Sequence, residues 1–263
     1  MIATELGELE AMRSLLSGPG GEVREVGGAL CTCFRDAPAS AMFNRALGLG
    51  LGRPATRADL ADIAGFFAER GVEYGIPLAP AAEPAELPAW LEEQGFRRGY
   101  AWTKFERGTD PAEAVDSDLR VEEVSDGALF ADVFMRAYGT PEVTRPMLER
   151  LPQLDGWHCF VAFADETPTA TGAVFAAGTV GWFGAAGTLP EARRRGAQNA
   201  LLAARIEAAR RVGCTTLVTE TGEPVDGKPG GSYRNIVRAG FEPTYVRQNY
   251  LSSATADTSG TRA

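Results

Sequence analysis

Hydrophobic residues in the first half of the chain follow two spacings, one helical and one strand-like. In the segment 56–71 they recur every three or four positions, which predicts an amphipathic helix that starts near Thr56 or Arg57 and ends at Gly71. Residues 22–47 carry short runs of β-forming residues separated by Gly, Pro and Asp, and these predict a meander of strands. The elements predicted next are a strand at 72–78, a short helix at 85–94 and a strand at 95–106.

A second series of elements follows a polar stretch without periodicity. Residues 106–118 are polar and acidic, which is typical of a linker. The elements predicted after it are strands at 119–124, 158–164, 170–177, 179–188, 214–220 and 241–251 and helices at 126–138, 142–150, 196–212 and 232–239. The pattern therefore predicts a domain at 1–108, a second domain at 118–252 and a disordered tail at 253–263.

The two halves share an order of elements and a short motif. In each half a helix leads into a hydrophobic strand, and a short helix then closes in the pattern G-F-x-x-x-Y, which begins at Gly95 and again at Gly240. Such repetition indicates duplication. We therefore expect an α/β fold of the α+β kind, with two tandem domains that each contain a mixed, mostly antiparallel sheet flanked by helices.

Composition and charge narrow the class of protein. Of the 263 residues, 44% are hydrophobic and 23% are charged, which is typical of a globular chain. The uncharged segment from Thr167 to Pro190 is interrupted by glycines, and the N-terminus shows no secretory signal. We therefore expect a cytoplasmic protein that does not enter a membrane. A formal net charge of -9 argues against broad binding to nucleic acid.

The cysteines and the single histidine show no metal-binding pattern. Cys31, Cys33, Cys159 and Cys214 lack C-x-x-C spacing and lie in apolar runs, which favours buried reduced thiols over a metal site or a disulfide framework. His158 has no second histidine to form a cluster with it, so we expect a structural role. The sequence therefore predicts no metal site.

Three consecutive arginines precede a helix in this acidic chain. Arg193, Arg194 and Arg195 come directly before Gly196 and the alanine-rich helix 196–212. The first N–H groups of a helix lack partners and attract anions, whereas arginines there cost about 0.3 to 1 kcal/mol each unless an anion binds. A glycine lets the backbone approach a phosphate closely. The turn is therefore interpreted either as a diphosphate cradle or as a solvated arginine run.

Helix 196–212 also has an ordinary packing face. The positions expected to pack on the sheet are Leu201, Leu202, Ile206 and Val212. Glu207 is placed to reach Arg211, four residues later. These residues are explained without any ligand.

The arginine turn and its surroundings resemble a known family. The segment "TLPEARRRGAQNALL" resembles the R/Q-x-x-G-x-G/A signature of the GNAT superfamily of N-acetyltransferases, with Arg193 at the first position, Gly196 at the fourth and Gln198 where Gly or Ala is usual. Downstream, "SYRNIVRAGF" resembles the short helix that closes the acetyl-CoA site of this family. The resemblance covers about 119–251. Some family members have two domains in tandem, and this arrangement extends the resemblance over nearly the whole chain. The first half is then a degenerate domain, because "GLGLGRPATRADL" contains no R-x-x-G.

This resemblance implies acetyl-CoA as the co-substrate and a set of residues that bind it. It implies that backbone N–H groups between Arg193 and Gln198 hold the diphosphate and that strand residues pair with the pantetheine amides. Ser232 is equally explained as the N-cap of its helix. The residues expected to bind the coenzyme are Thr188, Leu189, Arg193, Arg194, Arg195, Gly196, Ala197, Gln198, Ser232 and Asn235.

The same resemblance implies direct transfer of an acetyl group to an amine. Glu220, at the end of a predicted strand, is the candidate general base, and a merely solvated carboxylate is the alternative. Ile236 stands where the family usually has the tyrosine that acts as general acid. Tyr233, one turn earlier, is therefore the candidate acid, and a surface position is the alternative.

Three functions follow from these observations. The first is an acetyl-CoA-dependent N-acetyltransferase acting on a small-molecule or protein amine, as a monomer whose tandem domains take the place of a dimer. The second is a non-catalytic acyl-CoA-binding regulatory module, motivated by Ile236 at the acid position. The third is nucleic-acid binding by the arginines, for which steep salt dependence without competition by coenzyme A would be the evidence. The first is the function we expect.

Overall fold

The computed structural model describes residues 2–112 and 117–252. The predicted disordered tail, 253–263, lies outside these residues, as do positions 113–116 of the predicted linker. Over the described residues, no helix has both the length and the apolar character needed to cross a membrane.

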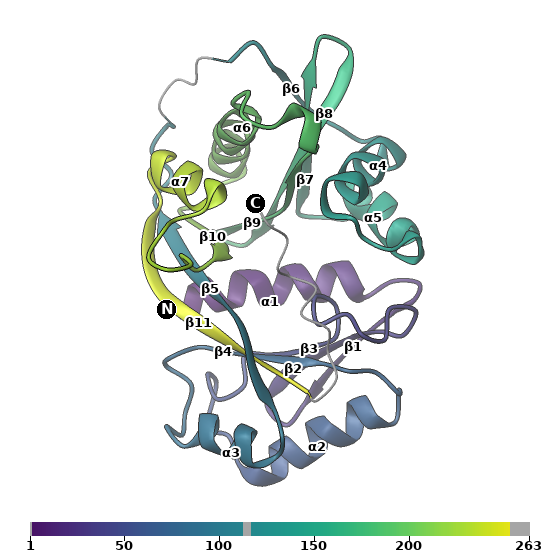
Figure 1. The fold of residues 1–263 in the computed structure, drawn as a ribbon, viewed down its shortest axis with the longest axis vertical. Helices are drawn as coiled ribbons and strands as arrows, with labels where there is room; N and C mark the ends of the chain where they lie inside the picture. Colours follow the sequence, from purple (N-terminus) through teal and green to yellow (C-terminus); the bar gives the residue numbers. More distant parts are fainter. Residues whose placement is uncertain (1, 113–116, 253–263) are drawn as a thin grey trace. The chain divides into compact units, whose positions relative to one another are not determined.

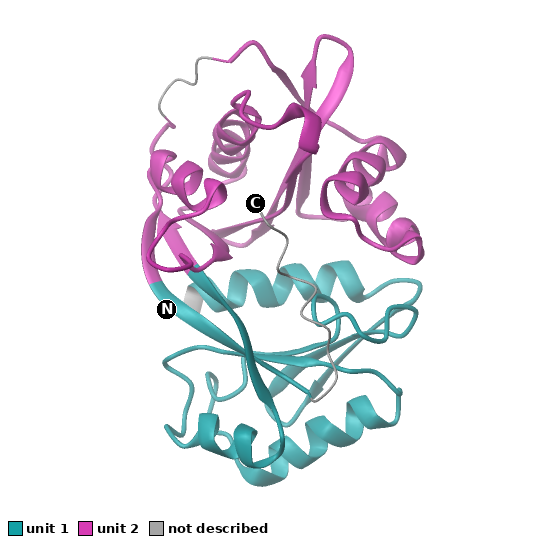
Figure 2. Cartoon of the chain, in the orientation of Figure 1, with its two compact units in different colours: residues 1–103, 245–262 teal, residues 104–244, 263 magenta. Residues whose placement is uncertain are grey.

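The chain divides into two compact units (Figure 2). Unit 1 contains Met1–Thr103 and Tyr245–Arg262, and unit 2 contains Lys104–Thr244. The boundaries fall within two strands, β5 (Arg97–Arg107) and β11 (Glu242–Leu251), so each unit contains part of both. This division differs from the predicted one, which gave the whole last strand to the second domain.

Unit 1 contains a sheet and three helices (Figure 1). Its elements besides β5 and β11 are α1 (Ile2–Leu16), β1 (Gly21–Val26), β2 (Ala29–Phe34), β3 (Arg45–Leu47), α2 (Arg57–Ala68), β4 (Gly75–Leu78) and α3 (Leu87–Glu93). The strand order in this unit is β1-β2-β3-β4-β11-β5. Residues 248–251 of β11 pair antiparallel with residues 75–78 of β4, which is why the end of the chain belongs to unit 1.

Helix α2 confirms its predicted start and packing face. Thr56 is the N-cap, and it forms a capping box with Asp59. Leu60, Ile63 and Phe67 are at most 1% exposed and lie in the core of the unit. The helical spacing of hydrophobic residues therefore identified the buried face correctly.

Unit 2 contains a mixed sheet with helices on both faces (Figure 1). Its elements besides β5 and β11 are β6 (Arg120–Glu123), α4 (Gly127–Tyr138), α5 (Arg145–Arg150), β7 (Trp157–Ala164), β8 (Thr167–Ala177), β9 (Val180–Thr188), α6 (Ala197–Arg211), β10 (Thr216–Gly222) and α7 (Gly231–Arg238), with short 3-10 turns η1 (Glu142–Thr144), η2 (Leu151–Gln153) and η3 (Pro190–Ala192). The strand order in this unit is β11-β5-β10-β9-β8-β7-β6. Strands β6 to β9 pair antiparallel, whereas β9 and β10 are parallel.

The two faces of the unit 2 sheet carry different helices (Figure 1). One face packs against α6 and α7, and its core includes Phe105, Leu201, Ile236 and Phe241. Helix α4 packs on β8 and β9 from the other face, next to α5. Ile236 is therefore a core residue, which gives a packing reason for an apolar side chain at the position where the family usually has tyrosine.

Three details of helices α6 and α7 correct the sequence analysis. Val212 is the C-cap of α6 and is 41% exposed, so it does not pack on the sheet. Glu207 pairs with Arg210, and Arg211 instead reaches Glu123 of β6. Helix α7 is capped at Gly230, so the N-cap explanation for Ser232 is wrong.

Helix α1 is the element that the hydrophobic pattern does not predict. Glu5 and Glu8 are 4% and 1% exposed, and both bind Arg247 of β11. Glu8 also binds Arg45. Because the buried face of this helix includes charged residues, its hydrophobic periodicity is weak, and only the tertiary ion pairs reveal which face is inside.

Candidate functional site

The turn before α6 has a backbone suited to an anion. Arg194 has φ 65° and Gly196 has φ 83°, so two residues of this short turn adopt the left-handed conformation. Gly196 is the N-cap of α6, and no side chain caps the helix. Within the described residues, the N–H groups of Arg194, Arg195 and Gly196 have no hydrogen-bond acceptor. Successive N–H groups in such a turn form a concave site for negative charge.

The side chains of the turn add positive charge. Arg193, Arg194 and Arg195 are all exposed. None of them forms an ion pair with any described Asp or Glu. A Cβ on Gly196 would come no closer than 3.6 Å to another residue, Ser117, so its left-handed φ, rather than crowding, is what requires glycine. The turn is therefore open and positively charged.

Strand β9 separates from β10 beside this turn. The two strands are paired only from Thr216 with Val180 to Val218 with Trp182. Beyond that pair, Thr219 Oγ1 donates to the carbonyl oxygen of Phe183 at 3.2 Å. Strand β9 then continues to Thr188 with no described backbone pairing on its β10 side. We call this separation the β9–β10 opening.

A β-bulge explains why β9 turns away. Two residues of β9 stand opposite one residue of β8, because Thr171 pairs with Gly187 and Ala173 pairs with Gly184. Ala185, inside the bulge, has φ 46°, and its carbonyl oxygen accepts a hydrogen bond from Thr171 Oγ1 at 3.2 Å. A bulge bends its strand and increases its twist, which separates β9 from its parallel neighbour.

The end of β9 brings several predicted coenzyme residues together. Gln198 Nε2 donates to Thr188 Oγ1 at 2.9 Å, which joins the start of α6 to the end of β9. The Leu189 N–H donates to the carbonyl oxygen of Thr169 in β8, and the Leu189 side chain is 3% exposed. Because paired residues in an antiparallel ladder alternate in bonding, the backbone groups of Thr188 point away from β8, toward the opening. Of the two strand residues, Thr188 is the one available to a ligand. Ala197, the first residue of α6, contributes its backbone while its side chain lies in the core.

The corresponding turn of unit 1 is closed by its own chain. The N-terminus of α2 is capped by Thr56, and Arg53 pairs with Asp59 at 2.6 Å. The carbonyl oxygen of Glu83 accepts a hydrogen bond from the Ala55 N–H at 2.8 Å, and a Cβ on Gly50 would lie 2.6 Å from that oxygen. Only the turn of unit 2 is left uncapped by side chains.

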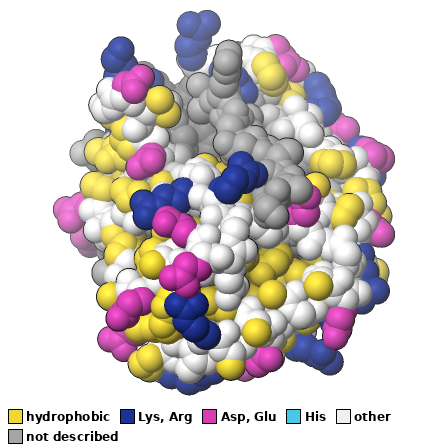
Figure 3. Space-filling view, turned by 60° about the horizontal axis from the view of Figure 1, so that its bottom comes forward, with side chains coloured by type: hydrophobic (Ala, Val, Ile, Leu, Met, Phe, Trp, Pro, Cys, Tyr) yellow, Lys and Arg dark blue, Asp and Glu magenta, His cyan; other side chains and the backbone are white. Residues whose placement is uncertain are grey.

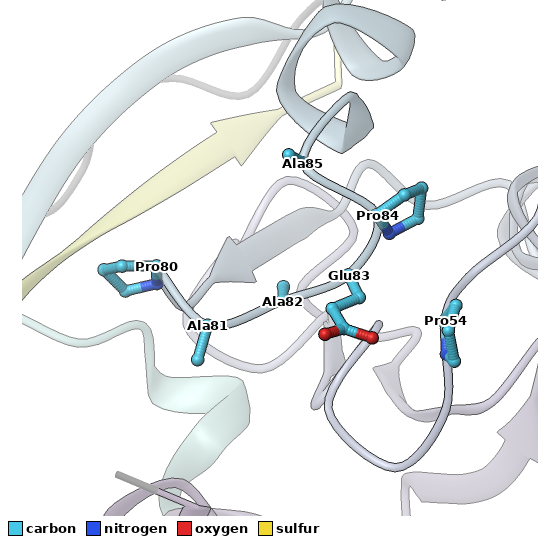
Figure 4. Close-up of a pocket in the computed structure, with 7 residues that line it drawn as sticks. All are labelled: Pro54, Pro80, Ala81, Ala82, Glu83, Pro84 and Ala85. Carbon is cyan, nitrogen blue, oxygen red and sulfur yellow. The ribbon is translucent and has the colours of Figure 1, made fainter.

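A shallow pocket lies over this closed loop (Figure 4). Its volume is about 460 Å³, and it is lined by Pro54 and residues 80–85. Apart from Glu83, these lining residues are proline and alanine. The side chains that line the pocket therefore include no donor for a phosphate group.

Glu220 lies in the part of β10 that has left β9. Its carboxylate oxygen Oε2 accepts a hydrogen bond from Lys104 Nζ of β5 at 2.8 Å, and the two side chains are 10% and 1% exposed. The predicted strand was expected to end at Glu220, whereas β10 continues to Gly222. The solvated alternative is wrong, since this carboxylate belongs to a buried ion pair.

The two predicted catalytic residues lie on opposite faces of the sheet. The Tyr233 ring packs edge-to-face on Phe105, with centroids 4.9 Å apart, among the core residues beneath α6 and α7. Glu220 binds Lys104, the residue next to Phe105 in β5. Side chains of successive strand residues point to opposite faces. The structure therefore does not bring Glu220 and Tyr233 together.

The predicted coenzyme residues of α7 are placed less distinctively. Ser232 is exposed, and Asn235 is half-buried. Asn235 Oδ1 accepts a hydrogen bond from Arg238 at 3.3 Å. Nothing in the described contacts of these two residues points to a ligand.

Sequence reasoning missed Lys104 and the bulge of β9. Lys104 lies in a segment that alternates like a strand, where a lysine is ordinarily exposed, so nothing marks it as buried. The run "GWFGAAGT" does carry a signal, since Gly184 and Gly187 are separated by two alanines in the middle of a strand. Glycine inside a strand pattern often marks a bulge.

Charges of both signs mix on the surface, and the described residues hold no cluster of metal ligands. Figure 3 shows Lys and Arg side chains interspersed with Asp and Glu over one face of the molecule. The described residues contain no group of three or more His, Cys, Asp or Glu side chains able to hold a metal ion. The four cysteines are buried and free. Desolvation raises the pKa of the Cys31 thiol to about 12. The prediction of buried reduced thiols is confirmed.

Comparison with known proteins agrees with this geometry. Residues 128–227 match the model of the Acetyltransferase (GNAT) family. Among curated proteins, none matches the sequence.

Solved structures of similar fold come from the same group of proteins. A GCN5-related N-acetyltransferase from Kribbella flavida is 18% identical and has a TM-score of 0.68, with 96% of each chain covered. One from Sphaerobacter thermophilus is 15% identical with a TM-score of 0.63, covering 88% of this chain and 75% of that one. A tandem GNAT protein from the clavulanic acid biosynthesis pathway is 16% identical with a TM-score of 0.64, covering 94% of this chain and 87% of that one. These likenesses establish the fold and confirm the expected tandem arrangement.

Proposed function

We propose, from the premise that residues 128–227 form a domain of the acetyltransferase (GNAT) family, that this chain transfers an acetyl group from acetyl-CoA to an amine. One observation carries the proposal. The open edge of β9 lies directly before a helix N-terminus that has no side-chain cap and is preceded by three exposed arginines. The open edge of β9 provides backbone groups for an extended amide chain, and the helix N-terminus provides donors for a diphosphate.

The residues of unit 2 fit the coenzyme at two places. The N–H groups from Arg193 to Gln198 would hold the diphosphate, with the arginine side chains adding positive charge. The backbone of Thr188 would pair with a pantetheine amide, and Gln198 fixes the Thr188 side chain through their hydrogen bond. When bound, acetyl-CoA supplies the activated acetyl group as a thioester.

Glu220 is the candidate proton acceptor for the amine. It lies in β10 beyond the last residue paired with β9, at the edge of the opening. Lys104 holds its carboxylate in place. Transfer to an amine requires the nitrogen to be neutral, and a fixed carboxylate there would take up its proton directly or through one water. Tyr233 is not needed for this step.

Thermal unfolding with acetyl-CoA tests the proposed site. Ligand at about one hundred times its Kd should raise the free energy of unfolding by roughly 2.7 kcal/mol. The variant G196V should lose this gain, because a branched side chain fills the space before the helix N-terminus.

A matched control is available at the other end of α6. Gly213 has φ 90° and open space around it, so G213V introduces the same backbone strain away from the turn. It should lower stability as much as G196V does and keep the full gain from acetyl-CoA. An equal gain in G196V and the wild type would refute the diphosphate site.

A second candidate function is a non-catalytic acyl-CoA-binding module. The burial of Ile236 and the placement of Tyr233 on the face opposite Glu220 favour it, because neither of these two positions supplies an acid beside Glu220. Release of free thiol from acetyl-CoA in the presence of candidate amines separates the two functions. Thiol release that depends on the amine excludes a purely binding role.

A further inference from the structure

Arg205, in the middle of α6, is a buried cation without an ion-pair partner in the part of the chain that the structure describes. It is 2% exposed, and no described Asp or Glu oxygen lies within 4.0 Å of it. The other basic side chains that are fully buried do have acidic partners. Arg247 binds Glu5 and Glu8, and Lys104 binds Glu220. Since burying an unpaired charge is costly, Arg205 calls for an explanation beyond packing.

The contacts of Arg205 satisfy only part of its guanidinium. Its Nε donates to the carbonyl oxygen of Leu201 at 3.1 Å, and its NH1 donates to that of Ala173 at 3.3 Å. The guanidinium lies over the Phe183 ring, 4.9 Å from its centroid. A Cβ on Gly172 would come within 2.9 Å of Nε, so β8 leaves space for the cation there. A guanidinium has five N–H donors, and the described residues accept from only two of its nitrogens.

The position of Arg205 coincides with the start of the β9–β10 opening. The Phe183 carbonyl oxygen accepts from Thr219, in the last described hydrogen bond between the two strands. Ala173 pairs with Gly184, where the bulge of β9 begins. The cation is therefore buried beside the point at which β9 leaves β10.

The surrounding groups leave this positive charge uncompensated. Burial lowers the pKa of Arg205 to about 9, which still leaves it charged at neutral pH. Tyr138 of α4 is the titratable group that interacts with it, and burial raises the pKa of this phenol, so it stays neutral. On the other face of the sheet, Glu220 and Lys104 carry opposite charges that cancel. Arg205 therefore gives the opening a net positive field.

We propose that Arg205 is a positioning residue that stabilises negative charge on the sulfur of coenzyme A at the β9–β10 opening. This inference rests on the proposed function. In the transfer, the amine nitrogen forms a C–N bond to the acetyl carbon, and the C–S bond breaks. The bonding electron pair leaves with sulfur, and the amine gives up one proton to the carboxylate of Glu220. Arg205 acts through its charge, across the Phe183 ring and the backbone of β9, and it favours the departing thiolate without touching it.

Titration of bound coenzyme A tests this directly. The thiolate is followed by its ultraviolet absorbance as the pH is raised, with coenzyme A free, bound to the wild type, and bound to R205M and R205K. The thiol pKa should be about one unit lower on the wild type than free in solution, a tenfold larger ratio of thiolate to thiol at a given pH. R205M should return it to the value of free coenzyme A, whereas R205K keeps the charge and should retain most of the shift.

Two controls separate this role from a structural one. R210M removes an exposed arginine of the same helix, which pairs with Glu207, and should leave the bound thiol pKa unchanged. Without ligand, R205M should unfold at the same or a higher temperature than the wild type, because it removes an unpaired buried charge. A clear loss of stability would show that Arg205 is retained for packing and would overturn the proposal.

The outcomes also separate this inference from the proposed function. If the wild type does not bind coenzyme A, both fail. If it binds coenzyme A with an unshifted thiol pKa, the role of Arg205 fails and the proposed function stands. That comparison needs no variant, so it decides the question even where R205M does not fold.

Discussion

At the scale of single residues, burial gives ordinary side chains their roles in this protein. Lys104 is unremarkable in the sequence, yet it forms an ion pair with Glu220, and the two side chains are 1% and 10% exposed. Asp59 is one acidic residue among many, yet it completes the capping box of α2 and binds Arg53. In both cases the partner is fixed by the fold, and the energetic consequence can be tested.

The Lys104–Glu220 pair should show strong coupling between its members. E220M removes the negative charge opposite a buried lysine and should lower the free energy of unfolding by about 3 kcal/mol. The double variant K104M/E220M replaces the pair with apolar side chains and should cost much less than the sum of the single variants. Urea denaturation of the four proteins of this cycle measures the coupling. Additive costs would show that the two charges are independent.

Asp59 should make stability depend on pH in the acid range. Hydrogen bonds from Arg53 and Thr56 hold the pKa of this carboxyl well below its ordinary value. The folded state therefore binds this proton less tightly than the unfolded state, so the stabilisation is complete above the unfolded pKa of about 4 and is lost as the pH falls below it.

The variant D59N isolates this contribution. At neutral pH it should be less stable than the wild type by about 1 kcal/mol, and the difference should shrink as the pH falls below about 4. Urea denaturation at several pH values measures it. A difference that is the same at pH 3 and pH 7 would mean that the charge of Asp59 does not contribute.

At the scale of elements, hydrophobic spacing predicted most helices and strands, and the exceptions have physical causes. Helix α1 escaped because its buried face carries Glu5 and Glu8. The end of α6 was extended by one residue because Val212 is apolar, although it is the exposed C-cap. The bulge of β9 depends on its register with β8, so the sequence of β9 alone does not define it. Hydrophobic spacing predicts a helix or strand whose buried face is uniformly apolar. It does not predict an element whose buried face carries paired charges.

Helix α6 offers a direct test of its packing face. Leu201 is fully buried in the core of unit 2, so L201A should lower the free energy of unfolding by about 3 kcal/mol. V212A, at the exposed end of the same helix, should change it by less than about 0.5 kcal/mol. Chemical denaturation of both variants measures the difference. Equal costs would contradict the burial of Leu201.

At the scale of the whole molecule, the end of the chain completes the sheet of unit 1. Residues 248–251 pair with β4, and Arg247 binds Glu5 and Glu8 of α1. Sequence order alone suggested two consecutive domains, because the predicted linker at 106–118 divides the chain into two similar halves. The contacts of β11 divide it differently.

Truncation tests this division. A chain that ends at Thr244 lacks the strand between β4 and β5 in unit 1, and it removes Arg247 from beside two buried carboxylates. We expect the first 103 residues to become sensitive to limited proteolysis, while a chain that ends at Ser252 keeps every described contact and stays resistant. Equal resistance of the two chains would show that unit 1 does not need β11.

The sequence by itself determined most elements of both halves, the tandem fold and the position of the arginine turn. These depend on local spacing and on glycines whose backbone conformation is decided within a few residues. Only the tertiary structure decided that Glu220 has a buried partner, that Tyr233 lies on the other face, that β9 leaves β10 at a bulge, and that Arg205 has no counterion among the described residues. Each of these features depends on contacts between different elements of the fold. Burial and strand pairing determine those contacts only once the sheet has formed.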